Sequence, residues 1–113
     1  MHELSLAEDM LTTLQERAKA DGFEQVKTVW LEVGKLSHVD AQAMTFCFDA
    51  VMSGTLAEGA KLEIIATSGK GQCRHCHQVS QIEHLYAPCS YCGEFGLEVV
   101  QGDQIRIKSV EVF

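Results

Sequence analysis

The sequence contains little proline and few basic residues. It has one proline among 113 residues, and its composition of 46% hydrophobic and 22% charged residues argues against a disordered segment. Nine Lys and Arg residues stand against sixteen Asp and Glu residues, so the net charge is −7. Because nucleic-acid binding depends on basic residues that face phosphates, we expect no nucleic-acid partner.

Long apolar runs are missing as well. No stretch approaches the roughly 20 apolar residues that span a bilayer. The first ten residues lack the basic start and the apolar run of a signal peptide. We therefore expect a cytoplasmic protein without a membrane partner, whose thiols stay reduced. Paired carboxylates, nucleophile–base spacing and a phosphate-binding loop do not stand out either, so we do not expect an enzyme.

Four of the five cysteines form two C-x-x-C pairs that are twelve residues apart. Cys73 and Cys76 make the first pair, and Cys89 and Cys92 make the second. Each pair can place two sulfurs on one ion from a tight turn, and the loop between the pairs can bring both turns together. The spacing predicts a structural Zn(II) site with four thiolate ligands. The fifth cysteine, Cys47, lies on the apolar face of a predicted helix and is expected to be a small buried residue.

Other interpretations of these cysteines fit less well. Disulfides are disfavoured in a reducing compartment. The segment 73–77 also matches C-x-x-C-H, the attachment sequence of c-type haem, but that chemistry needs export and would leave Cys89 and Cys92 without a role. His75 and His77 are either substitute zinc ligands, since imidazole suits zinc, or solvent-facing side chains.

Hydrophobic periodicity predicts helices and strands along the rest of the chain. A leucine-rich helix begins near residues 3–5, with Ser5 and Glu8 as a capping box, and ends at Gly22. A second helix covers 41–52, with Asp40 as its N-cap. Strands are expected at 26–33, 61–67, 97–100 and 104–113, with a hinge at 68–71 and a bulge near 108–109.

This order of elements predicts a small α+β fold. We expect a sheet of about three main strands with two helices on one face, and an inserted four-cysteine module that resembles a zinc ribbon. The α+β domain would be discontinuous, comprising 1–69 and 98–113, and the zinc module would comprise 70–97.

The amino terminus offers a second set of metal ligands. If Met1 is retained, its α-amine, the His2 backbone nitrogen and the His2 imidazole can close fused chelate rings in a plane. The Glu3 amide, or a side chain from elsewhere, could supply a fourth donor. A planar nitrogen set favours Ni(II) or Cu(II) over zinc. The alternative is an exposed histidine without a function.

Several segments together resemble the HypA/HybF family of hydrogenase nickel-incorporation proteins. They are MHELSLAEDM, VWLEVGKLSHVD, FCFDAV, GTLAEGAKLEI and the two C-x-x-C pairs, and the resemblance covers the chain from Met1 to the last strand. It implies a non-catalytic metallochaperone that works with the GTPase HypB. The recipient of the Ni(II) would be the large-subunit precursor of [NiFe]-hydrogenase.

By position, the resemblance assigns nickel to His2, with the Met1 amine and the Glu3 region beside it, and zinc to the four paired cysteines. Candidates for a further nickel contact are His38, Asp40, His75, His77 and His84. Both a monomer and a homodimer remain open. The competing function is a zinc-ribbon interaction module that transfers no metal.

Overall fold

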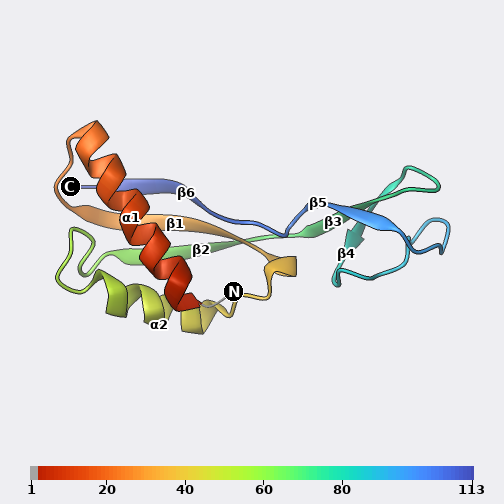
Figure 1. The fold of residues 1–113 in the computed structure, drawn as a ribbon, viewed down its shortest axis with the longest axis horizontal. Helices are drawn as coiled ribbons and strands as arrows, with labels where there is room; N and C mark the ends of the chain where they lie inside the picture. Colours follow the sequence, from red (N-terminus) through yellow and green to blue (C-terminus); the bar gives the residue numbers. More distant parts are fainter. Residues whose placement is uncertain (1–2) are drawn as a thin grey trace. The chain divides into compact units, whose positions relative to one another are not determined.

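The computed structural model describes residues 3–113, which form two α-helices, a short 3-10 helix and six strands (Figure 1). In chain order they are α1 (Glu3–Asp21), β1 (Val26–Gly34), η1 (Lys35–Ser37), α2 (Ala41–Met52), β2 (Lys61–Thr67), β3 (Gly69–Cys73), β4 (Val79–Ile82), β5 (Leu97–Gln101) and β6 (Ile105–Val112). The strands form two three-stranded sheets, ordered β2-β1-β6 and β4-β3-β5. The predicted α+β class, with two helices and an inserted four-cysteine module, is confirmed. The second sheet was not predicted.

The chain divides into two compact units. The first takes in the chain up to Leu31, together with Val39–Ile64 and Ile107–Phe113, and the second takes in Glu32–His38 and Ile65–Arg106. The boundary crosses β1, β2 and β6, so each of these strands contributes to both units. Within residues 3–113, neither α-helix combines the length and the hydropathy that crossing a bilayer requires.

The core of the first unit lies between the two helices and β1. Helices α1 and α2 pack against each other. The buried apolar residues of this core are Ala7, Met10 and Leu14 of α1, Met44, Phe48 and Met52 of α2, and Val26, Val29 and Leu31 of β1. Their three- and four-residue spacing within the helices is the pattern of one apolar helix face. Leu4, which the sequence places on this face, is instead 50% exposed.

The first turn of α1 is stabilised by a contact with the start of α2. The helix includes Glu3, so Ser5 lies inside it and the predicted Ser5–Glu8 capping box does not form its N-terminus. The Glu3 carboxylate accepts a hydrogen bond from the backbone N–H of Asp40 at 3.3 Å. Asp40 itself caps α2 as predicted, because its Oδ1 accepts the N–H groups of Gln42 at 2.8 Å and Ala43 at 3.2 Å.

In the second unit, β3 is a strand where the sequence predicts a hinge. It pairs antiparallel with β4 on one side and with β5 on the other. Neighbouring strands approach the glycines of β3 so closely that a side chain would not fit. A Cβ on Gly69 would lie 2.6 Å from the Ile82 carbonyl oxygen, and a Cβ on Gly71 would lie 3.0 Å from the Leu97 Cβ. Ladder hydrogen bonds on both edges compensate for the low strand preference of glycine.

Three glycines from distant parts of the sequence meet in this unit. A Cβ on Gly34 would overlap the carbonyl of Gly102, and a Cβ on Gly102 would lie 2.6 Å from the Cα of Gly69. Hydrogen bonds connect the same segments, because Leu36 donates its N–H to the Gly102 carbonyl at 2.8 Å. The turn between β5 and β6 therefore contacts backbone so closely that no side chain fits at Gly102.

The crossing at Gly102 predicts a large cost for adding a single methyl group. Gly102→Ala combines a left-handed backbone, with φ of +93°, and a collision with Gly69, so we expect a loss of about 3 kcal/mol or more in the free energy of unfolding. Gly54→Ala is the matched control, since its φ is +77° but nothing lies within 4 Å of the added Cβ. It should cost about 1 kcal/mol. Urea unfolding of the two full-length variants measures both, and equal losses would contradict the packing account.

Candidate metal centre

The two C-x-x-C pairs adopt the same backbone hydrogen-bond pattern. In the first, the Cys73 N–H donates to the Gln78 carbonyl at 2.9 Å and the His77 N–H donates to the Cys73 carbonyl at 3.0 Å. In the second, the corresponding bonds join Cys89 to Glu94 at 2.9 Å and Gly93 to Cys89 at 2.8 Å. The fourth residue after each first cysteine is left-handed, with φ of 63° at His77 and 78° at Gly93. Each pair is thus a closed metal-binding turn.

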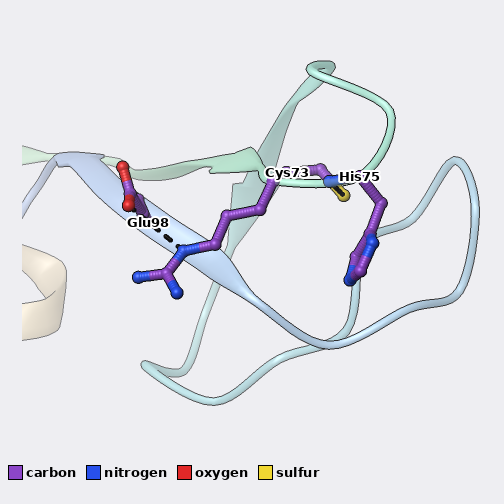
Figure 2. A network of polar contacts seen from close by, with 4 residues as sticks. Cys73, His75 and Glu98 are labelled. Atoms are coloured by element: carbon purple, nitrogen blue, oxygen red, sulfur yellow. Dashed lines mark hydrogen bonds and ion pairs between the residues drawn. The ribbon is translucent and has the colours of Figure 1, made fainter.

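Backbone amides point at the sulfur of the first cysteine in each turn. The His75 N–H donates to the Cys73 Sγ at 3.3 Å (Figure 2), and the Tyr91 N–H donates to the Cys89 Sγ at 3.4 Å. Cys73 also accepts the N–H of Cys76 at 3.5 Å. Such donors stabilise the negative charge of a thiolate, which is the form that binds metal.

The four sulfurs converge on one point. The Sγ atoms of Cys73 and Cys92 are 3.6 Å apart, as are those of Cys76 and Cys89, and all four lie within 4.8 Å of one another. Zinc bonded to four sulfurs at about 2.3 Å would separate them by about 3.8 Å in a tetrahedron. The sulfur positions therefore fit a tetrahedral metal site. The spacing in the sequence correctly predicted that these four cysteines form one cluster. No histidine of residues 3–113 belongs to the cluster.

Crowding of the thiols drives their pKa values apart. Hydrogen bonds from the backbone of Cys92, and then of Tyr91, outweigh burial and lower the pKa of Cys89 to about 6. The pKa of Cys73 is lowered in the same way, chiefly by the backbone N–H of Cys76. At Cys92 the backbone N–H of Glu94 favours the thiolate, but burial and the neighbouring cysteines outweigh it and raise the pKa to about 12. Four thiolates this close need a cation to hold them together.

A pair of serines supports the second turn and was not predicted. Ser80 on β4 is 3% exposed, and its Oγ lies 3.9 Å from the Cys89 Sγ. Ser90 donates to the Ser80 Oγ at 3.1 Å. Because ten residues separate the serines and no motif links them, the sequence carries no signal for this contact.

The remaining candidate residues are dispersed. Met1 and His2, the centre of the predicted nickel site, lie outside the described residues. The four other histidines are exposed, namely His38, His75, His77 and His84. Cys47 is half-buried in α2, apart from the cluster. The Glu3–Asp40 contact joins two predicted nickel-site residues, although the sequence analysis invoked the Glu3 backbone rather than its carboxylate.

Comparison with known proteins identifies the family. The family described as "Hydrogenase/urease nickel incorporation, metallochaperone, hypA" matches residues 1–112. The hydrogenase maturation factor HypA of Azotobacter chroococcum mcd 1 is 46% identical over 112 residues, and that of Azotobacter vinelandii is 43% identical, each alignment covering 99% of both chains. The chain belongs to the HypA family. Its members are metallochaperones for hydrogenase maturation rather than enzymes, as the resemblance implied.

Solved structures show that the fold is also that of HypA. The solution structure of the Ni metallochaperone HypA from Helicobacter pylori matches with a TM-score of 0.74 at 24% identity, covering 99% of this chain and 97% of that one. A second structure, titled "Solution structure of HypA protein", matches with a TM-score of 0.77 at 23% identity. At these identities the likeness supports the fold alone.

The geometry of the cluster predicts that metal content depends on the paired cysteines and not on the fifth. Cys89→Ser removes a buried sulfur at the convergence point, so the metal content of the purified protein should fall from about one ion per chain to near zero. The control Cys47→Ser, which changes a cysteine outside the cluster, should keep the metal. Elemental analysis measures both, and a Cys89→Ser variant that retains a full equivalent would contradict the four-sulfur site.

Proposed function

We propose that this HypA family member binds Ni(II) at Met1-His2-Glu3 and delivers it to the precursor of the [NiFe]-hydrogenase large subunit. The observation that carries the proposal is the match to the nickel-incorporation family, which begins at residue 1. The Asp40 N–H donates to the Glu3 carboxylate at 3.3 Å, which brings Asp40 beside the residue that follows His2. The family match from residue 1 includes all three proposed nickel-site residues. A site with few side-chain ligands suits a cargo that must be bound and then released.

The proposed donor set consists of nitrogens from two adjacent residues. The Met1 amine, the His2 backbone nitrogen and the His2 imidazole can bind one ion in a plane, beside the Glu3 backbone. Asp40 is the candidate for an additional ligand. Both of its capping bonds involve Oδ1, so the carboxylate can cap α2 through one oxygen and bind a cation through the other. Because the amine and the amide must lose protons, nickel affinity should fall at low pH.

We assign Zn(II) to Cys73, Cys76, Cys89 and Cys92 as a structural ion. The fit of the sulfur positions to a tetrahedron supports this choice. Bound there, zinc would contribute roughly 10–16 kcal/mol of folding free energy, as in zinc-finger peptides. In this division of labour, residues 1–69 and 98–113 form the nickel-binding domain and 70–97 form the zinc-binding module.

The partners that we propose follow from the family. Hydrogenase maturation factors are 41–46% identical to this chain over 99% of its length, which supports a hydrogenase precursor as the recipient of nickel. We propose a HypB-type GTPase as the protein that drives delivery. We propose that the protein acts in the cytoplasm, where its thiols stay reduced.

If the amino terminus is the nickel site, His2→Ala should abolish specific Ni(II) binding and leave one zinc per chain. The reason is that His2 supplies the only imidazole adjacent to the amine. Calorimetric titration of the untagged protein with Ni(II) measures the loss, which should exceed about 100-fold in Kd. Gln81→Ala, which changes an exposed side chain outside both proposed metal sites, is the control and should bind nickel normally. Unchanged nickel affinity in His2→Ala would favour the zinc-ribbon interaction module without metal transfer.

Two substitutions of Asp40 separate its capping role from nickel binding. Asn is as good an N-cap as Asp, so Asp40→Asn should change the free energy of unfolding by less than about 0.5 kcal/mol, whereas Asp40→Ala should cost about 1 kcal/mol. If the carboxylate binds nickel, both variants should weaken nickel binding about equally, by roughly 10-fold or more. Urea unfolding and nickel titration of the same samples measure the two effects. Normal nickel affinity in Asp40→Asn would restrict Asp40 to its cap.

A further inference from the structure

Exposed apolar side chains are concentrated in one short part of the chain. Among the residues that the structure describes, ten large hydrophobic side chains are exposed, and five of them lie between residues 79 and 95. The loop between β4 and β5 carries four of the five, which are Leu85 (39% exposed), Tyr86 (88%), Tyr91 (66%) and Phe95 (67%). We call these four residues the aromatic tip. Single exposed apolar residues are ordinary, but a concentration of them is typical of an interaction surface.

The backbone that carries the aromatic tip is held by hydrogen bonds. The Tyr91 N–H donates to the Cys89 Sγ at 3.4 Å, and the Glu94 carbonyl, just before Phe95, accepts the Cys89 N–H at 2.9 Å. A turn closed by the Ala87 N–H and the His84 carbonyl, at 3.3 Å, holds Leu85 and Tyr86. A surface on such a backbone loses little conformational entropy on binding, so more of its apolar area contributes to affinity.

The charges around the aromatic tip are negative. The sequence contains no Lys or Arg between Arg74 and Arg106. Arg74 is itself paired, since its Nε lies 3.1 Å from the Glu98 Oε1 (Figure 2). Glu83 precedes the tip in the sequence and Glu94 lies between Tyr91 and Phe95, and neither glutamate forms a salt bridge within residues 3–113. The tip therefore consists of aromatic side chains beside uncompensated carboxylates.

We propose that the aromatic tip is the docking surface for a protein partner whose face carries an apolar pocket bordered by Lys and Arg side chains. Tyr and Phe are enriched in the cores of protein interfaces, and complementary charge at the rim steers and orients the encounter. A second copy of this chain fits less well, because its net charge is −7. The inference rests on the proposed function, since it takes the partner from the two proteins of nickel delivery proposed there.

The test uses the full chain loaded with zinc. The tip variant replaces Tyr86, Tyr91 and Phe95 with Ser. The control variant makes the same replacement at Phe46 and Phe113, whose side chains are 75% and 78% exposed in the other unit. Each is titrated calorimetrically with the purified GTPase and with the purified hydrogenase large-subunit precursor, at pH 8, where histidine is neutral. The Kd of one partner should rise at least about 10-fold for the tip variant. The control variant should bind within about twofold of the unchanged chain.

A second variant tests the contribution of the carboxylates beside the aromatic tip. Glu83→Lys with Glu94→Lys should weaken the same partner, and 0.5 M NaCl should reduce the difference between this variant and the unchanged chain, as expected for exposed charges. Equal affinity of the tip variant and the unchanged chain for both partners would overturn the proposal. An equal loss in the control variant would also overturn it, as would tip-dependent self-association of the chain in light scattering.

The same samples separate this inference from the proposed function. If the tip variant loses docking but binds one nickel and one zinc per chain, the docking surface is established independently of the nickel site. If His2→Ala retains nickel binding while the tip variant loses docking, the proposed function fails and the docking surface remains.

Discussion

The part of the chain from β3 to β5 buries very few apolar side chains. Within the described part of this segment, the buried side chains are Cys73, Ser80, Ile82 and Cys89, and two of the four belong to the sulfur cluster. The convergence of four thiols is therefore the interaction on which this part of the chain depends. Thiolates 3.6 Å apart repel one another unless a cation binds them. Backbone N–H donors lower the pKa of Cys89 to about 6, whereas burial and the neighbouring cysteines raise that of Cys92 to about 12.

The two proposed metal sites differ in the way their ligands are held. Each paired cysteine sits in a turn closed by backbone hydrogen bonds, and the first sulfur of each turn is buried. Such a closed set of four thiolates suits a structural ion. At the amino terminus, one hydrogen bond joins the two described ligand candidates, Glu3 and Asp40. Fewer constraints leave room for a partner's ligand to enter, as transfer of a cargo requires.

Features set by local sequence could be predicted, and features set by contacts between distant residues could not. The paired cysteines, both helices and the Asp40 cap depend on spacings of a few residues, and they were predicted correctly. The Glu3–Asp40 contact spans 37 residues, and no periodicity encodes it. For β3, the glycines read locally as a hinge, yet they are the residues that let neighbouring backbone approach. Leu4 fits the apolar stripe by its spacing, yet its side chain is 50% exposed.

The proposal that one chain binds two metals in sites of different chemistry is tested most directly by X-ray absorption. The measurement uses the nickel and zinc edges of one untagged, nickel-loaded sample. The account predicts one zinc per chain surrounded by four sulfurs at about 2.3 Å, and one nickel surrounded only by nitrogen and oxygen. Sulfur in the nickel shell, or loss of zinc as nickel is added, would show that the cysteines bind the cargo and would contradict the account.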